Sequence, residues 1–295
     1  MNSMKKYKVG FVGLGIMGKP MVHNLLDNNV QVYFFARKQK IIKSIEKRGG
    51  KFVPLISDIP KHTKIMITNL PETKDVVSVT TSKTGMFYNL KKGSCVIDMS
   101  TISPEGAKEI NNKLKKRNVS FIDAPVSGGE AGAISGNLSI MAGGDKKAFN
   151  KVKPILELLG KKITYIGKSG SGQICKMCNQ ILVAQTIYAV SEIINITTKS
   201  KVDSNRIREA LLGGYADSKI LEIHGKRMID TDFKPGFKLS LHHKDLKIAK
   251  SYLSSLGIKL NSLNHVKKIM NLAEKEGLSD LDSSVIHSIL EKTYK

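Results

Sequence analysis

The spacing of apolar residues changes near Gly167, and this change limits the possible folds more than any other feature of the chain. Before Gly167, short runs rich in β-branched and aromatic residues alternate with segments of helical spacing, which predicts a mainly parallel sheet with helices on both faces. The strands are expected at 7–12, 31–35, 65–70, 95–99, 119–123, 138–142 and 163–166. The helices between them are expected at 17–28, 41–48, 74–80 and 104–116.

After Gly167 the strand patterns stop. A loop at 167–172 is followed by a helical pattern that continues to about Lys199. Further helices, several opened by Asp or Ser and closed by Gly, are expected at 203–212, 217–229, 240–256, 262–275 and 280–291. The sequence therefore predicts an α/β domain over 1–167, a long interdomain helix over 168–199 and an all-α domain over 200–295.

A glycine-rich turn lies between the first expected strand and the first expected helix. It reads Gly13-Leu14-Gly15-Ile16-Met17-Gly18, a G-x-G-x-x-G pattern. Gly13 allows the tight turn, Gly15 lets a pyrophosphate approach the backbone, and Gly18 allows close packing of helix on strand. Because the N–H groups and the positive end of that helix favour phosphates, we expect a doubly wound, Rossmann-type domain that binds a dinucleotide through these six residues.

The end of the second expected strand indicates which dinucleotide is preferred. Enzymes that use NAD usually carry an acidic residue there for the ribose 2′-hydroxyl, whereas an Arg accommodates the 2′-phosphate of NADP. This chain has no carboxylate at the position and continues with Arg37 and Lys38. We therefore expect NADP(H) to be favoured over NAD(H), with Arg37 as the main contact and Lys38 assisting.

The chain is strongly basic, with 48 Lys and Arg against 25 Asp and Glu and a formal charge of +23. Proteins that bind nucleic acids usually concentrate such charge or combine it with stacking aromatic residues. Here the lysines are spread over many helices, aromatic residues make up 6% and Trp is absent. We expect solvated lysine-rich surfaces and no nucleic-acid partner.

Cysteine content and hydropathy indicate the compartment. Three cysteines argue against a disulfide framework, and the longest uncharged run, 177–191, is shorter than a membrane span and contains polar residues. No apolar signal-peptide core is visible near the N-terminus. Cys175 and Cys178 form a C-x-x-C pair without the second pair or the His spacing of a zinc site. A cytoplasmic protein without a metal or a membrane partner is expected.

Several motifs occur in an order that resembles the β-hydroxyacid dehydrogenase family, which includes 3-hydroxyisobutyrate dehydrogenase. They lie at Gly13–Met21, Asp98–Thr101, Asp123–Gly129, Gly170–Asn179 and Lys244–Leu246, and so extend over almost the full length. The resemblance implies the fold described above, an NAD(P)-dependent reaction at a CH–OH group, and a homodimer or homotetramer.

The resemblance also implies a role for residues that would meet the substrate. Ser127, Gly128 and Gly129 would hold the substrate carboxylate, Asn179 would bind the substrate, and Lys176 matches the catalytic lysine of the family. The chemistry agrees, because reduction of an aldehyde leaves an alkoxide that needs a cation or a proton donor. Lys176 and Asn179 are three residues apart and so share one face of a helix.

Other matching positions are implied to meet the cofactor. Leu70 and Pro71 would line the cofactor groove, and Thr101 would contact the ribose near the nicotinamide. Lys244 would reach the cofactor from the helical domain. These assignments come from the resemblance alone.

The expected activity is reversible NADPH-dependent reduction of a small carboxylate-bearing aldehyde, with Lys176 as proton donor. Glu130 and the stretches 233–237 and 241–246 are most similar to members that convert tartronate semialdehyde to D-glycerate. Three alternatives remain open: 3-hydroxyisobutyrate, succinic semialdehyde or glyoxylate as substrate; an imine reductase, which typically lacks the lysine; and a basic, non-catalytic protein that binds nucleotides or nucleic acids.

Overall fold

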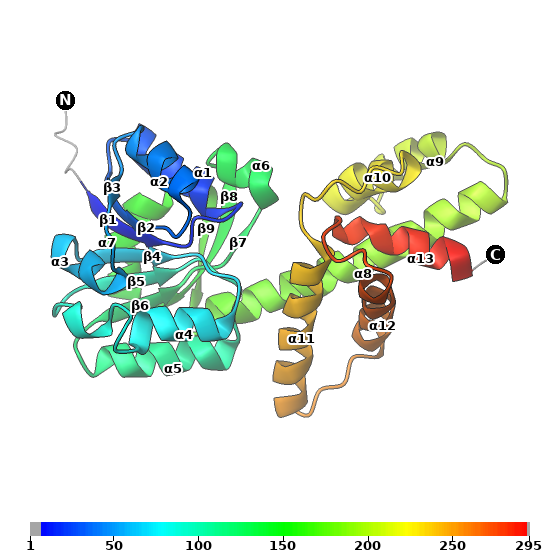
Figure 1. Cartoon of the computed structure of the whole chain (residues 1–295). Helices are drawn as coiled ribbons and strands as arrows, with labels where there is room; N and C mark the ends of the chain where they lie inside the picture. Colours follow the sequence, from blue (N-terminus) through cyan, green and yellow to red (C-terminus); the bar gives the residue numbers. More distant parts are fainter. Residues whose placement is uncertain (1–6, 294–295) are drawn as a thin grey trace. The chain divides into compact units, whose positions relative to one another are not determined.

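The computed structural model describes residues 7–293. It contains two compact units, one ending at Lys176 and the other beginning at Met177. Figure 1 shows a sheet with its covering helices in the first unit and helices in the second. Among the described residues no strand follows Gly167, so the expected change from α/β to all-α structure is confirmed.

The first unit contains a mainly parallel sheet in the order β3-β2-β1-β4-β5-β6-β8-β7, with β9 paired to β8. Only the contacts of β8 with β6 and with β7 are antiparallel. The strands are β1 Lys8–Val12, β2 Gln31–Phe35, β3 Lys51–Phe52, β4 Ile65–Thr68, β5 Cys95–Asp98, β6 Ser120–Asp123, β7 Val126–Ser127, β8 Leu138–Gly144 and β9 Gly160–Gly167. The expected strands are all present, whereas the two-residue strands β3 and β7 are too short to give a sequence pattern.

Two apolar clusters lie on opposite faces of this sheet because successive side chains of a strand point to opposite sides. In β1, Phe11 packs in one cluster with Met21 of α1, and Val12 packs in the other with Ile59 of α3. The helices of the unit are α1 Gly18–Asp27, α2 Gln39–Glu46, α3 Ile59–His62, α4 Thr73–Thr81, α5 Pro104–Lys115, α6 Gly129–Ile134 and α7 Lys146–Leu156.

Helix α5 begins at Pro104, the first residue of the helix expected over 104–116. The hydroxyl of Ser103 accepts the N–H of Gly106 at 3.0 Å, and Pro104 occupies the first helical position. Helix α7 was not among the expected helices, although Asp145 caps it in the same way and Phe149 and Val152 form its buried stripe. Pro154 in its last turn interrupts the helical composition.

The remaining helices are α8 Ser171–Lys199, α9 Ser204–Leu212, α10 Lys226–Ile229, α11 Leu239–Ser255, α12 Asn261–Lys275 and α13 Ile286–Thr293. The helix expected over 217–229 differs, because a π-helical turn at Leu221–Gly225 precedes α10. The helix expected from 280 begins later, with a short 3-10 turn at Ser283–Val285 before α13. By length and composition alone, α8 could cross a bilayer, but the core helix of a soluble protein passes the same test.

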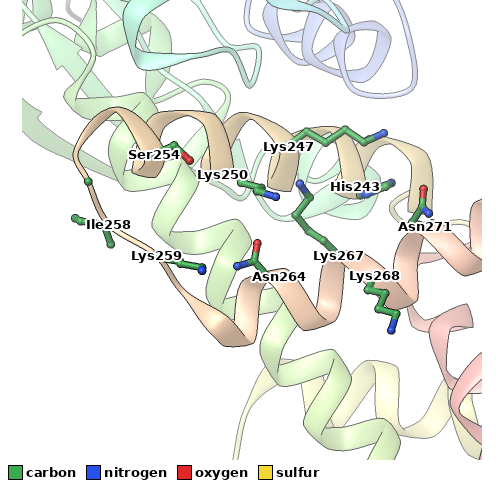
Figure 2. Close-up of a pocket in the computed structure, with 11 residues that line it drawn as sticks. His243, Lys247, Lys250, Ser254, Ile258, Lys259, Asn264, Lys267, Lys268 and Asn271 are labelled. Carbon is green, nitrogen blue, oxygen red and sulfur yellow. The ribbon is translucent and has the colours of Figure 1, made fainter.

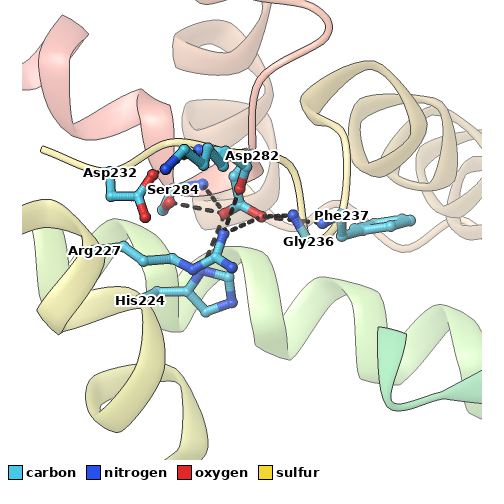
Figure 3. Close-up of polar contacts among 8 residues, drawn as sticks. His224, Arg227, Asp232, Gly236, Phe237, Asp282 and Ser284 are labelled. Atoms are coloured by element: carbon cyan, nitrogen blue, oxygen red, sulfur yellow. Dashed lines mark hydrogen bonds and ion pairs between the residues drawn. The ribbon is translucent and has the colours of Figure 1, made fainter. Parts of the chain in front are cut away.

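Two features of the second unit are used below. Helices α11 and α12 pack together beside a hollow of about 700 Å³ (Figure 2). Asp282, whose side chain is fully buried, receives hydrogen bonds and ion pairs from three separate segments at 224–227, 236–237 and 284 (Figure 3).

Candidate active site

The glycine-rich turn contains three glycines. Its conformation requires glycine at two of these positions and leaves empty space beside the third. Gly13 has φ +106°, and a Cβ added there would lie 2.0 Å from the carbonyl oxygen of Asn69. A Cβ at Gly18 would lie 1.9 Å from the carbonyl oxygen of Gly13. At Gly15 a Cβ would meet nothing within 4 Å, which leaves room for a group to approach the backbone.

The N-terminus of α1 suits an anion. No side chain caps it, and its first turn contains no acidic residue. Its first N–H groups therefore remain available to phosphate oxygens, and the helix dipole adds to the attraction. Within the turn, Leu14 is buried, Met17 is half-buried and Ile16 is exposed. The residues present thus fit a dinucleotide pyrophosphate.

The turns that follow β1, β4 and β5 meet at one edge of the sheet. The N–H of Asn69 donates to the carbonyl of Val12 at 2.9 Å, and the N–H of Leu70 donates to the hydroxyl of Ser100 at 2.8 Å. Pro71 follows Leu70 and is exposed, while Thr101 follows Ser100 and is half-buried. The expected cofactor residues of the first unit are therefore gathered where parallel strands end, as is usual for ligands of such sheets.

Arg37 and Lys38 follow β2. This strand pairs with β1 on the side opposite to β4. Both side chains are exposed. Lys38 is the residue that precedes α2, and its side chain makes no capping hydrogen bond.

Asp98, at the end of β5, organises the turn that carries Ser100 and Thr101. Its Oδ1 accepts the hydroxyl of Thr68 at 2.8 Å and that of Ser100 at 2.6 Å. Its Oδ2 is buried and has no hydrogen-bond partner among the described residues. Burial raises the pKa of Asp98 to about 7, against the opposing effect of these hydrogen bonds.

This buried carboxyl gives a prediction about pH. The folded chain holds the Asp98 proton up to about pH 7, whereas the unfolded chain releases it near pH 4. Between these values the folded state binds more protons, so stability falls as pH rises. Relative to wild type, Asp98→Asn should therefore gain unfolding free energy from pH 4 to 7, by up to about 1.4 kcal/mol per pH unit.

Urea denaturation of the cofactor-free protein at several pH values measures this difference. The matched control is Glu46→Gln, which changes an exposed carboxyl of the same unit. Its unfolding free energy should differ from that of wild type by the same amount at every pH. If the difference in unfolding free energy between Asp98→Asn and wild type did not change with pH, the raised pKa of Asp98 would be contradicted.

Asp123, at the end of β6, anchors the start of α8. Its Oδ1 accepts the N–H of Gly170 at 2.8 Å and its Oδ2 accepts the N–H of Gln173 at 3.1 Å. The carboxyl is fully buried, and burial raises its pKa to about 6. The Gln173 amide adds a second tie, because its Nε2 donates to the carbonyl of Ser100 at 2.9 Å. The first turn of α8 is thus fixed to the ends of β5 and β6.

Lys176 lies one turn further along α8 and is only 7% exposed. The same β6 that anchors its helix leads directly into β7 and the Ser127-Gly128-Gly129 turn. Gly128 has φ +133° and Gly129 has φ +61°, conformations that favour glycine. Ser127 is half-buried, Gly128 is the N-cap residue of α6, and the helix begins at Gly129.

The second unit connects Asn179 with Lys244 through two residues that were not predicted. The Asn179 amide donates to Oε1 of Gln180 at 2.8 Å, and Nε2 of Gln180 donates to Oδ2 of Asp245 at 2.7 Å. The ammonium of Lys244 lies 3.0 Å from Oδ1 of Asp245. A continuous polar chain therefore joins α8 to α11 and orients both predicted side chains.

Cys175 is half-buried and Cys178 is exposed, and neither is part of a disulfide bond. Within residues 7–293 no group of three His, Cys, Asp or Glu side chains could hold a metal ion.

Comparisons with known proteins agree with this geometry. Residues 8–167 match the family model of the NAD-binding domain of 6-phosphogluconate dehydrogenase. Residues 170–290 match the model described as NAD-binding of NADP-dependent 3-hydroxyisobutyrate dehydrogenase. The chain is 40% identical to the 2-hydroxy-3-oxopropionate reductase of Escherichia coli K12, over 96% of this chain and 97% of the relative.

Two matches of lower sequence identity are 3-hydroxyisobutyrate dehydrogenases. The mitochondrial 3-hydroxyisobutyrate dehydrogenase of Drosophila melanogaster is 33% identical over 96% of this chain and 89% of its own. The solved structure of the Mycobacterium tuberculosis 3-hydroxyisobutyrate dehydrogenase with L-serine has a TM-score of 0.89 and 26% identity, covering 97% of this chain and 99% of that one. The chain therefore belongs to the β-hydroxyacid dehydrogenase family and is an NAD(P)-dependent oxidoreductase of the 3-hydroxyisobutyrate dehydrogenase type.

Proposed function

We propose that this enzyme reduces a small carboxylate-bearing aldehyde with NADPH, reversibly, and that its substrate is tartronate semialdehyde, which it converts to D-glycerate. The observation that carries the proposal is the buried Lys176 on a helix anchored by Asp123, four residues before Ser127. The 40% identical Escherichia coli relative, named for reduction of 2-hydroxy-3-oxopropionate, supports the choice of substrate.

The first unit would hold the dinucleotide. Its pyrophosphate would lie over Gly15 at the N-terminus of α1, and Leu70, Pro71 and Thr101 would border the nicotinamide half. Arg37, assisted by Lys38, would hold a 2′-phosphate, because no carboxylate competes at this strand end. When bound, NADPH supplies the hydride.

The substrate would be held by its carboxylate. The hydroxyl of Ser127 and the N–H groups of Gly128 and Gly129 would donate to its oxygens. Asn179 would orient the substrate, and the Lys176 ammonium would stabilise the forming alkoxide and protonate it. Lys244, held by Asp245, would contribute a second cation for the cofactor.

Cofactor choice can be tested at Arg37. Arg37→Asp should shift the ratio of kcat/KM for NADPH over NADH by about 100-fold towards NADH, since a charge-assisted contact is lost and a repulsive charge is gained. Steady-state kinetics with both cofactors measure the ratio. Arg48→Asp, at an exposed cation on the same unit, is the control. An unchanged ratio in Arg37→Asp would refute the assignment of Arg37 as the main contact of the 2′-phosphate.

The substrate is tested by following NADPH consumption with tartronate semialdehyde, methylmalonate semialdehyde, succinic semialdehyde and glyoxylate. Tartronate semialdehyde should give the highest kcat/KM. A higher value for methylmalonate semialdehyde, in which a methyl group replaces the hydroxyl of tartronate semialdehyde, would assign the enzyme to 3-hydroxyisobutyrate instead.

The organisation of the chain is part of the same proposal. Residues 1–167 would bind the cofactor, 168–199 would connect the domains, and 200–295 would complete the substrate site and form a homodimer or homotetramer. The protein would act in the cytoplasm.

A further inference from the structure

The hollow between α11 and α12 is surrounded by ammonium groups. It has a volume of about 700 Å³ and receives side chains from both helices and from the loop that joins them (Figure 2). Five lysines line it, namely Lys247, Lys250, Lys259, Lys267 and Lys268. Figure 2 shows Lys250 and Lys267 pointing toward one another across the space between the helices. Lys176, Asn179 and Lys244 do not line it.

The positive charge of this hollow is poorly compensated. Residues 243–271 contain six lysines and a single acidic residue, Asp245, which gives a formal charge of +5. Among the described residues, the carboxylate that reaches the lining lysines is Glu274, 3.8 Å from Lys247, and it is shared with His243 at 2.8 Å.

Other lysines of the second unit differ in this respect. Lys226 lies 2.8 Å from Asp230, and Lys238 lies 2.7 Å from Asp280.

Burial, followed by the charges of Lys250 and Lys247, lowers the pKa of Lys267. The lining lysines therefore repel one another, and a bound anion would relieve that repulsion.

We propose that this hollow is a binding site for a small metabolite that carries two or more phosphate groups. Its volume is in the range of small-molecule sites. Lysines bind phosphate as point charges, and each phosphate brings about −1.5 to −2 charges, so two would balance most of the five ammonium groups. The amides of Asn264 and Asn271 add neutral donors at the wall.

The composition of the wall favours this ligand over a nucleic acid. None of the 11 lining residues is Phe, Tyr or Trp, and the imidazole of His243 is only 2% exposed, so no open ring face is offered to a base. None is an Arg, the residue whose planar guanidinium forms two hydrogen bonds to a phosphate of a nucleic-acid backbone. The hollow offers charge without a surface for bases.

Calorimetric titration of the full chain tests the proposal, with inorganic tripolyphosphate as probe. The protein is first saturated with NADPH, so that the phosphates of the probe cannot occupy the glycine turn. At about 150 mM salt, where the Debye length is about 8 Å, saturable binding with one site per chain is expected. Lys250→Gln/Lys267→Gln should weaken it by about tenfold or more, since two charge-assisted contacts are lost.

The matched control is Lys199→Gln/Lys275→Gln, which removes the same charge from exposed positions of the same unit outside the hollow and should change the affinity less than about threefold. Equal weakening by both double variants would show attraction to the basic surface in general and overturn the proposal. Absence of binding at millimolar probe would also overturn it, as would tighter binding of a single-stranded oligonucleotide that depends on Lys250 and Lys267. Circular dichroism of both variants checks that they fold.

Discussion

Lys176→Met is expected to lower kcat for aldehyde reduction by about 10²–10⁴-fold, because the variant loses the group that we propose to stabilise and protonate the alkoxide. Met keeps the length and volume of the side chain, which is only 7% exposed, so α8 should remain in place. Stopped-flow or steady-state kinetics at saturating NADPH measure the loss. The dissociation constant of NADPH should change by less than about threefold, since the proposed pyrophosphate and ribose contacts involve other residues.

Two further variants separate the physical causes. Lys176→Arg keeps the positive charge but cannot give up a proton near neutral pH, so it should restore substrate affinity more than kcat. Lys199→Met, at the exposed end of the same helix, should leave kcat unchanged. A Lys176→Met enzyme with wild-type kcat would remove the basis of the proposed mechanism.

Asp282→Ala is expected to lower the free energy of unfolding by about 3–5 kcal/mol, the cost of breaking a buried ion pair by removing one partner. In the wild type, Arg227 lies 3.0 Å from Oδ2 and His224 Nδ1 lies 3.1 Å from Oδ1. The carboxylate also accepts the N–H groups of Gly236, Phe237 and Ser284, each at 3.0 Å (Figure 3). All these donors lose their acceptor in the variant.

Urea or thermal denaturation measures this loss, with Asp280→Ala as the control. Asp280 is 85% exposed and pairs with Lys238 at 2.7 Å, and exposed pairs contribute at most about 1 kcal/mol. If both variants lost equal stability, Asp282 would not have the organising role described here.

The pH dependence of Asp282 has the opposite sign to that of Asp98. Burial alone would raise the pKa of Asp282, but hydrogen bonds from His224, Phe237 and Ser284 outweigh it and hold the pKa well below its usual range. Its contribution to stability is therefore complete above about pH 4 and is lost as pH falls further. Wild type should lose stability more steeply than Asp282→Ala in acid.

The glycine turn illustrates what could be predicted from the sequence. Gly13 and Gly18 are required by contacts within a short segment and with the neighbouring strand, so their spacing alone identifies the motif. The Ser103 cap of α5 was predictable for the same reason, because the hydroxyl and its N–H donor are three residues apart. Local spacing also identified α8 as one long helix.

Asp123 and Asp98 illustrate what could not be predicted. Asp123 accepts hydrogen bonds from residues 47 and 50 positions later, and the Gln180–Asp245 contact spans 65 positions. The one available signal was a carboxylate that ends an apolar strand run, and that signal does not identify a partner. The raised pKa values also depend on burial, which is a property of the assembled sheet.

The sequence by itself determined most of the strands and helices along the chain, the glycine-rich turn and the family, because these depend on backbone geometry and side-chain spacing over a few residues. Only the tertiary structure decided which polar groups are buried together: Asp123 with the first turn of α8, Asp282 with His224 and Arg227, and the lysines of α11 with those of α12. The physical reason is that hydrogen bonds and charges act over a few ångströms in space, whatever the distance along the chain.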